Sequence, residues 1–278
     1  MGNNTYRVLD SGNFRKLEQV GPWRISRPAL NAVWKPTLPE SQWNACDAVF
    51  HRKNDGSGSW DFKKKLPESW VVDYAGFNIK VKPTGFGHLG FFAEQYRNWN
   101  FFREEVKTGD NALNLFGYSG IGSMAFAANG ANVCHLDASR GMNEWGREIL
   151  ALNPNIPDNI RWITDDVKKF TTRETRRGSH YNWIALDPPS FGRGAKGEVW
   201  KIETDLPKLL ETLSVLRDPD RPFTLILSCH SPGFSISSME RLVVDIFGKG
   251  EWFDSFEMTI PEESKGVLPA GISVRWRG

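Results

Sequence analysis

The sequence predicts an α/β protein in which a mostly parallel sheet of seven strands is covered by helices, after a small antiparallel β region. From residue 112 onward, short apolar runs alternate with segments of helical periodicity, which is the pattern of repeated β–α units. The last two runs, 251–260 and 271–276, have no helix between them and predict an antiparallel hairpin at one sheet edge. Upstream of residue 90, short β-prone runs separated by turn residues predict antiparallel hairpins.

Each element is expected where its run of residues lies. In the N-terminal region, strands are expected at 20–25, 48–52, 59–62, 70–74 and 77–81. A helix from Phe91 to about Lys107 follows a glycine-rich segment, so we place a domain boundary near residue 90, between domains 1–90 and 91–278. The first domain is expected to serve either substrate recognition or packing. The sheet strands are expected at 112–116, 132–137, 160–164, 182–187 and 223–229, with helices at 121–129, 139–152, 167–175 and 205–216. Ser237 and Glu240 predict the capping box of one more helix.

Composition narrows the class of protein. A hydrophobic content of 40% with 24% charged residues is typical of a soluble globular protein, and a net charge of +2 gives no overall attraction to nucleic acid. Cys46, Cys134 and Cys229 lack the spacing of a disulfide framework or a metal site, which indicates a reducing compartment. No apolar run reaches membrane-spanning length, so we expect a cytoplasmic protein that needs neither membrane nor metal. Its oligomeric state has no signature in the sequence.

The glycine-rich stretch Leu113–Gly122 is the central motif. An apolar strand enters a tight turn, and a small-residue helix leaves it, so that backbone N–H groups can receive the polar atoms of a ligand. Gly120-x-Gly122-x-x-Ala125 also fits the dinucleotide fingerprint. A nicotinamide-dependent oxidoreductase is therefore an alternative at this point.

Carboxylates follow the next two predicted strands. Asp137 can accept both hydroxyls of a ribose, or it can cap the helix that begins near Ser139. Asp165 and Asp166 can accept a hydrogen bond from an adenine amine, or either can cap the helix that begins at Val167.

The fourth predicted strand ends in Asp187-Pro188-Pro189-Ser190-Phe191. The two prolines fix φ and supply no N–H donors, so the chain leaves the sheet along a stiff, extended path. We expect the carbonyls of residues 187–189 to remain as acceptors beside Asp187, with Phe191 placed to stack on a planar ring. A buried structural turn is the alternative.

These four segments together resemble a known family. LNLFGYSGIG, HLDAS, TDDVKKF and LDPPSFGRG, in this order, are similar to the motifs of class I S-adenosylmethionine-dependent methyltransferases, which have a Rossmann-like sheet. Within them, residues 83–235 resemble the branch that contains bacterial large-subunit ribosomal RNA methyltransferases acting on cytosine C5 or guanine N7.

The resemblance implies a role for each matching residue. It implies that S-adenosyl-L-methionine contacts Phe116, Gly117, Tyr118, Ser119 and Gly120 at its methionine and ribose end, Asp137 and Ala138 at the ribose, and Asp166 at the adenine. It implies that Asp187 with Pro188 forms the site of transfer, where Asp187 also contacts the cofactor. We expect the acceptor base to lie over Asp187, Pro188, Pro189 and Phe191. Gln95 matches a cofactor-proximal segment of the branch, although Glu94 and Tyr96 differ from the Asp and Arg found there.

Cys229 ends the fifth predicted strand, where cytosine-C5 enzymes of the resembling branch carry a nucleophilic thiolate. A small buried residue is the alternative, and His230 could instead occupy the matching position. Basic residues at Lys168, Lys169, Arg173, Arg176 and Arg177 are expected on a solvated helix face. Arg193, Lys196 and Lys201 follow the Pro-Pro turn and could contact phosphates.

The sequence therefore predicts a methyltransferase acting on an RNA base, ribosomal RNA being favoured, with RNA as its partner. A methyltransferase for protein or for a small molecule is an alternative. A non-catalytic RNA-binding protein that keeps the fold is another, besides the oxidoreductase.

Overall fold

The computed structural model describes residues 4–53, 57–194, 197–264 and 266–278. It divides into two compact units. The N-terminal unit contains Met1–Glu94 and Thr259–Ala270, and the C-terminal unit contains Gln95–Met258 and Gly271–Gly278.

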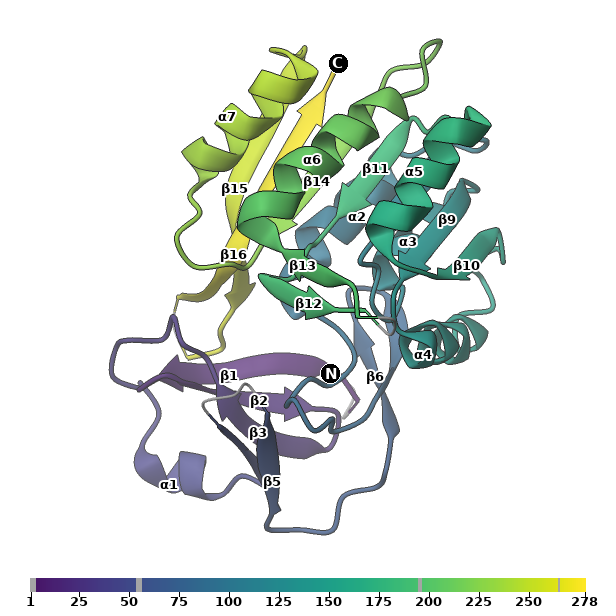
Figure 1. Cartoon of the computed structure of the whole chain (residues 1–278). Coiled ribbons are helices and arrows are strands. Elements are labelled where there is room, and N and C mark those ends of the chain that lie inside the picture. Colours follow the sequence, from purple (N-terminus) through teal and green to yellow (C-terminus); the bar gives the residue numbers. More distant parts are fainter. Residues whose placement is uncertain (1–3, 54–56, 195–196, 265) are drawn as a thin grey trace. The chain divides into compact units, whose positions relative to one another are not determined.

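The C-terminal unit is built on a seven-stranded sheet with the order β10-β9-β8-β11-β14-β16-β15 (Figure 1). The first five of these strands pair in parallel, whereas β16 is antiparallel to β14. The predicted α/β class, with a mostly parallel sheet and the last two strands at one edge, is confirmed. The strands are β8 (Asn111–Leu115), β9 (Asn132–Asp137), β10 (Ile160–Thr164), β11 (Trp183–Leu186), β14 (Thr224–Cys229), β15 (Trp252–Pro261) and β16 (Val267–Arg277).

Helices cover both faces of this sheet. Figure 1 shows α5, α6 and α7 on one face and α2 and α3 on the other, and α4 packs against β9 and β10. The helices are η1 (Ala93–Gln95, a 3₁₀ turn), α2 (Tyr96–Glu105), α3 (Ile121–Ala127), α4 (Arg140–Ala151), α5 (Val167–Arg177), α6 (Ile202–Val215) and α7 (Ile236–Phe247).

The spacing of apolar residues explains why these helices pack as they do. In α6, Leu206, Leu209, Leu210 and Leu213 follow the i, i+3, i+4, i+7 pattern and are all buried. Each such side chain contributes about 1.5–3 kcal/mol by leaving water. On the opposite face, α2 and α3 meet through aromatic stacking, since the ring centroids of Phe102 and Phe126 are 3.9 Å apart.

Two local features differ from the sequence-based expectation. The N-cap of α7 is Ser235, which forms a capping box with Ser238, so the predicted pair Ser237 and Glu240 is wrong. Ser235 and Ser237 are only two positions apart, so either could act as the N-cap. Because Ser235 does so, the helix starts two residues earlier than expected. A hairpin that was not predicted, β12 (Phe191–Arg193) with β13 (Val199–Lys201), follows the Pro-Pro turn.

The N-terminal unit contains a five-stranded sheet of order β1-β2-β3-β4-β5 and a separate β6–β7 hairpin. Neighbouring strands are antiparallel, except that β3 and β4 are parallel. The predicted strand at 20–25 is wrong, because a turn at Gly21, with φ +62°, divides it between two strands. The elements are β1 (Tyr6–Gly12), β2 (Arg15–Val20), β3 (Trp23–Pro28), α1 (Glu40–Asn44), β4 (Ala48–Arg52), β5 (Gly58–Phe62), β6 (Trp70–Tyr74) and β7 (Phe77–Val81).

None of the helices described in the two units is both long enough and apolar enough to span a membrane.

Candidate functional site

The carboxyl ends of the parallel strands define the candidate site. Since β8, β9, β10, β11 and β14 run in the same direction, the segments that follow them emerge at one edge of the sheet. The predicted site residues after these strands are Phe116–Gly120, Asp137 and Ala138, Asp166, Asp187–Phe191 and Cys229. Motifs that are far apart in the sequence therefore lie side by side along this edge of the sheet.

The turn after β8 adopts an unusual backbone. Phe116 and Tyr118 have φ values of 54° and 51°, and Gly120 has a φ of 80°. Left-handed φ values in residues other than glycine cost about 1–3 kcal/mol each and persist where the surroundings impose them. Here the surroundings include the backbone of β9, because Gly117 N–H donates to the Leu136 carbonyl at 3.0 Å.

Bulky side chains lie directly beneath this turn and leave no room for a side chain at Gly117 or Gly120. A Cβ at Gly117 would collide with the His135 ring, and one at Gly120 would collide with Trp162. His135 Nδ1 lies 2.8 Å from Ser123 Oγ, which accepts a hydrogen bond of 2.9 Å from Asn114. Burial lowers the pKa of His135 to about 3, so the imidazole ring beneath the turn is uncharged at neutral pH.

Asp137 joins the turn to the start of α4. Its Oδ2 accepts the Tyr118 N–H at 2.9 Å, and its Oδ1 accepts the Ser139 N–H at 2.8 Å. Burial raises the pKa of Asp137, and these two backbone donors oppose the rise. The alternative that Asp137 caps α4 is wrong, because Ser139 is the N-cap. Ala138, between them, is exposed.

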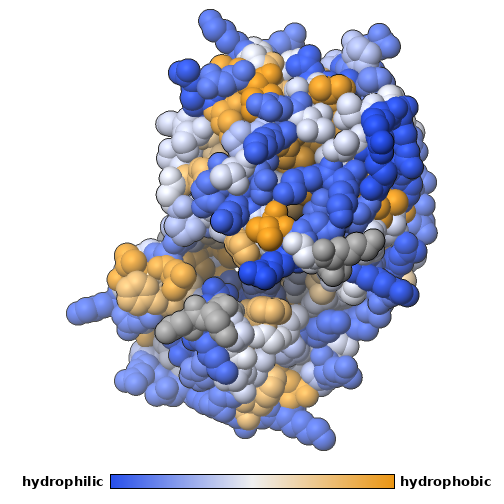
Figure 2. Space-filling view, in the orientation of Figure 1, coloured by the Kyte–Doolittle hydropathy of each residue, from blue (hydrophilic) through white to orange (hydrophobic). Residues whose placement is uncertain are grey.

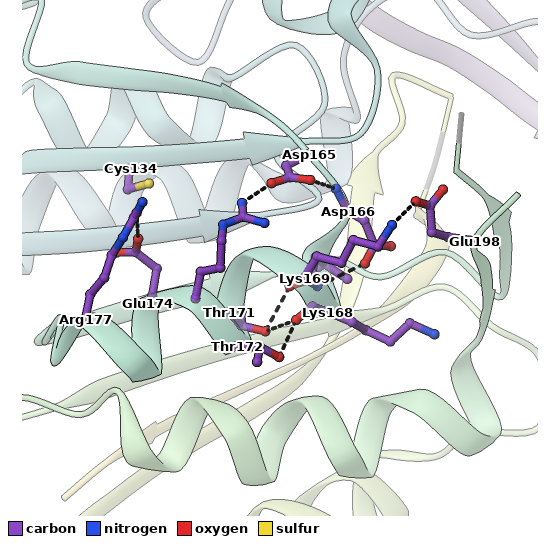
Figure 3. Close-up of polar contacts among 12 residues, drawn as sticks. Cys134, Asp165, Asp166, Lys168, Lys169, Thr171, Thr172, Glu174, Arg177 and Glu198 are labelled. Atoms are coloured by element: carbon purple, nitrogen blue, oxygen red, sulfur yellow. Dashed lines mark hydrogen bonds and ion pairs between the residues drawn. The ribbon is translucent and has the colours of Figure 1, made fainter. Parts of the chain in front are cut away.

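Asp166 caps α5. Its side chain accepts the Lys169 N–H at 3.0 Å, so the capping interpretation is confirmed for this residue. Asp165 accepts the Asp166 N–H at 2.8 Å and forms an ion pair with Arg173 (Figure 3). The two consecutive carboxylates therefore serve different partners.

Asp187, directly after β11, is held by two residues from distant parts of the sequence. Gln95 Nε2 donates to Asp187 Oδ2 at 2.9 Å, and His230 Nε2 lies 3.2 Å from each carboxylate oxygen but hydrogen-bonds only Oδ2. Asp187 Oδ1 is buried and has no hydrogen-bond partner among the described residues. A buried carboxylate oxygen in that state is costly to the folded protein.

The Pro-Pro turn that follows is anchored by Trp200 of β13. Trp200 Nε1 donates to the Pro189 carbonyl at 2.7 Å, and its ring contacts Phe116 edge-on with centroids 4.9 Å apart. The expectation that all three carbonyls of residues 187–189 remain without partners is thus wrong for Pro189. Pro188 is buried, whereas Pro189 and Phe191 are exposed.

Cys229 is 2% exposed at the end of β14. Burial raises the pKa of its thiol, the Ser231 backbone N–H and hydroxyl oppose this rise, and the charge of Asp187 adds to it. The thiol is therefore protonated at neutral pH.

The basic residues of α5 are largely paired with acids. Lys169 pairs with Glu198, and Arg177 with Glu174 at 2.8 Å (Figure 3). Lys168 pairs with Asp205 at 3.4 Å. Figure 2 shows the hydrophilic band that this helix places on the surface of the C-terminal unit. After the Pro-Pro turn, Arg193 and Lys201 are exposed, and Lys196 lies outside the described residues.

The N-terminal unit has a cavity of about 150 Å³ of its own, lined by aromatic and charged side chains that include Phe50, Arg52 and Glu94. Two cations in its wall, Lys16 and Arg27, contact the buried Glu18 at 3.1 and 2.6 Å.

Three residues near Asp187 were not assigned a role from the sequence: Asn98, Trp200 and, as a partner of Asp187, His230. No sequence motif surrounds Trp200. Asn98 lies three positions after Gln95, and this helical spacing is the sequence feature that could have placed the two side chains together. No group of three or more His, Cys, Asp or Glu side chains within the described ranges is arranged to hold a metal ion.

Comparison with known proteins gives the same fold at full length. A crystal structure of an S-adenosylmethionine-dependent methyltransferase from Agrobacterium tumefaciens is 37% identical, with a TM-score of 0.91 over 99% of this chain and 91% of that one. A Streptococcus mutans protein described as a methyltransferase of the same kind shares the fold at 16% identity, with a TM-score of 0.77 over 100% of this chain and 76% of that one.

A curated relative from Pseudoalteromonas translucida, named ribosomal RNA large subunit methyltransferase K/L, is 27% identical over 185 residues, which are 66% of this chain and 25% of the relative. The chain thus spans about a quarter of the length of the curated relatives that it matches. The profile of the S-adenosylmethionine-dependent methyltransferase family matches residues 31–233, well over half of the sequence. This chain therefore belongs to the S-adenosylmethionine-dependent methyltransferases.

Proposed function

We propose that this chain transfers a methyl group from S-adenosylmethionine to a base in RNA, with ribosomal RNA as the favoured substrate. The observation that carries the proposal is Asp187, whose Oδ1 is buried without a hydrogen-bond partner among the described residues at the carboxyl end of β11. The rigid Pro188–Pro189 path continues from it. Curated relatives named for ribosomal RNA methylation support the choice of RNA.

The residues after β8 and β9 fit the cofactor. We propose that the turn Phe116–Gly120 receives its methionine and ribose end, because it follows β8 at the carboxyl edge of the sheet and its two glycines add no side chain to it. Each oxygen of Asp137 accepts one backbone N–H and keeps a lone pair for a ribose hydroxyl, beside the exposed Ala138. Asp166 uses its Oδ1 to cap α5, and we propose that its second oxygen accepts the adenine amine.

When bound, the cofactor supplies a methyl group on a sulfonium, which an electron-rich atom of the acceptor takes by in-line displacement. The chain's own task is orientation, which can account for several kcal/mol of the barrier. Gln95 and His230 hold Asp187 Oδ2 and so fix the carboxylate beside the Pro-Pro turn, where we propose that it orients a donor group of the acceptor base. Trp200 fixes the Pro189 carbonyl and so holds the start of the hairpin that carries Phe191.

Labelled S-adenosylmethionine tests the proposal. The protein is incubated separately with total RNA, total protein and a metabolite fraction, and we expect label in RNA alone. Asp187→Ala should lower the rate by about 10²-fold or more, as for loss of a group that holds the reacting partner. Asp165→Ala, which removes a strand-end carboxylate paired with Arg173, is the matched control and should keep most of the activity.

Label in the protein or metabolite fraction would identify another methyltransferase class. RNA that is bound and never methylated would favour the non-catalytic alternative. A recognition role for residues 1–90 stays a prediction, which crosslinking of RNA to Arg52, at the cavity of the N-terminal unit, would test.

A further inference from the structure

A chain of hydrogen-bonded polar side chains connects Arg275, on β16, to Asp187. Arg275 Nε donates to Asn98 Oδ1 at 2.9 Å, and Asn98 Nδ2 donates to Gln95 Oε1 at 2.8 Å. Gln95 Nε2 then donates to Asp187 Oδ2 at 2.9 Å. Asn98 lies on α2 and is 2% exposed, so its bond to Arg275 is shielded from water, whereas Gln95 and Asp187 are half-buried.

The two ends of the chain determine which way each amide points. A guanidinium can only donate and a carboxylate can only accept, whereas Asn and Gln have one accepting and one donating end. Asn98 must therefore turn its oxygen to Arg275 and its nitrogen to Gln95. Gln95 must in turn present its oxygen to Asn98 and its nitrogen to Asp187. Reversing either amide would set donor against donor or oxygen against oxygen.

Arg275 is a dependable donor at the start of this chain. Burial lowers its pKa to about 10, so it remains a cation at neutral pH. Its other nitrogens are held by Asp254 at 2.9 Å and by the Arg97 carbonyl at 2.7 Å. The guanidinium therefore cannot turn away from Asn98 without losing both contacts.

The serines beside the chain do not set its direction. Ser273 Oγ lies 3.1 Å from Asn98 Nδ2, and Ser228 Oγ lies 3.3 Å from both Asn98 Nδ2 and Gln95 Oε1. A hydroxyl rotates to donate or to accept, so either serine would accommodate both orientations of the amides. The direction comes from Arg275.

We infer that Asn98 is a positioning residue for methyl transfer: it fixes the orientation of the Gln95 amide, so that Gln95 holds Asp187 Oδ2 and keeps the carboxylate in place for the acceptor. The link from Asn98 to Asp187 is a property of the fold. Its consequence for methyl transfer rests on the function proposed above.

Asn98→Asp tests the link without a change of shape. Its carboxylate still accepts from Arg275, but it cannot donate to Gln95, so the Gln95 amide turns and points its oxygen at Asp187. We expect the Tm to fall by roughly 4 °C or more, from one mismatched buried contact. In an Asp187→Asn background the same substitution should change Tm by no more than about 1 °C, because the amide introduced by Asp187→Asn can donate to the turned Gln95.

A Gln95→Met background separates this relay from simple repulsion between two carboxylates. The thioether side chain has no amide to turn, so the coupling between positions 98 and 187 should vanish in that background. Equal destabilisation by Asn98→Asp in the presence and in the absence of Asp187→Asn overturns the inference. Coupling that survives in the Gln95→Met background overturns it as well.

A measurement with Asn98 intact covers the case in which Asn98→Asp does not fold. Asp187→Asn should shift the NMR resonances of the Asn98 side-chain NH₂, although the relay links these residues only through Gln95. Unchanged Asn98 resonances would contradict the relay.

Steady-state kinetics of RNA methylation provide the last test. Asn98→Asp should lower kcat for RNA methylation about tenfold or more, with less than about a threefold change in the KM for RNA. A loss confined to KM would contradict the positioning role. If the wild-type protein methylates no RNA, the proposed function fails, whereas the Tm cycle still decides whether the relay exists.

Discussion

The side chains at the strand ends differ in how burial affects their hydrogen bonding and their pKa. Asp187 keeps one oxygen without a hydrogen-bond partner among the described residues, whereas both oxygens of Asp137 accept backbone N–H groups. Cys229 is buried close enough to Asp187 for that charge to raise the pKa of its thiol. These environments make Asp187, rather than Cys229, the group suited to act on an acceptor.

Cys229→Ser distinguishes a direct transfer from a covalent route. A protonated, buried thiol is a poor nucleophile, so we expect turnover to stay within about threefold of the wild-type value. The measurement is single-turnover methyl transfer to RNA. Complete loss of turnover in a folded Cys229→Ser protein would instead support attack by Cys229 on a pyrimidine ring.

Glu18 gives the N-terminal unit a pH-dependent stability. Burial alone would raise its pKa, but the charges of Arg27 and Lys16 and the bonds from Arg27 and Tyr6 lower it from 4.5 to about 2. A carboxyl group whose pKa is depressed on folding stabilises the protein above its unfolded pKa. This stabilisation is lost as the pH falls through about 4.5 towards 2.

Glu18→Gln should therefore lower the free energy of unfolding by about 3–5 kcal/mol at pH 7, because two buried cations lose their counter-charge. Between pH 4 and 2 the wild-type protein should approach the variant. Urea unfolding of both proteins across this range measures the difference. A gap that stays constant with pH would contradict the assignment of the charge to Glu18.

Among the elements, the β12–β13 hairpin links the two halves of the site in the C-terminal unit. Trp200 bonds the Pro189 carbonyl and contacts the Phe116 ring, so one side chain joins the Pro-Pro turn to the glycine-rich turn. The hairpin is also tied to α5, through Lys168 Nζ and the Val199 carbonyl at 2.8 Å.

Trp200→Phe should separate these two contacts. The phenyl ring keeps an aromatic contact with Phe116 but loses the indole N–H, so we expect a lower kcat with nearly unchanged S-adenosylhomocysteine affinity. Trp276→Phe is the matched control, since it loses a comparable indole bond of 3.1 Å to the Gly248 carbonyl, in the packing of α7. Both variants should lose about 1–3 kcal/mol of stability, and only the first should lose activity. Equal kinetic losses would make the effect one of stability alone.

The elements that the sequence predicted well are those with strong local patterns. The runs 48–52, 70–74 and 77–81 match β4, β6 and β7, because alternation and turn residues bound each run. The run at 20–25 failed because its apolar residues span a Gly-Pro turn. Strands β1 and β2 were missed, since their polar residues hide the alternation and are buried by long-range contacts such as that of Asp10 with Trp43.

For the whole molecule, ligand-dependent stability separates a methyltransferase from the oxidoreductase alternative. S-adenosylhomocysteine at 100 times its Kd should raise the free energy of unfolding by about 2.7 kcal/mol and increase Tm accordingly. NAD at the same concentration should leave Tm unchanged. Thermal unfolding with each ligand measures this, and stabilisation by NAD alone would contradict the assignment of the cofactor.

The sequence by itself determined the fold class and the order of the strand-end motifs, since both follow from local periodicity and from the chemistry of Gly, Pro and Asp in turns. It also located Asp137, Asp166 and Asp187 at strand ends. The tertiary structure alone decided which side chains meet Asp187, because Gln95 and His230 are 92 and 43 positions away in the sequence. Local patterns carry no information on such contacts, which arise only when the sheet order brings α2, β11 and β14 together.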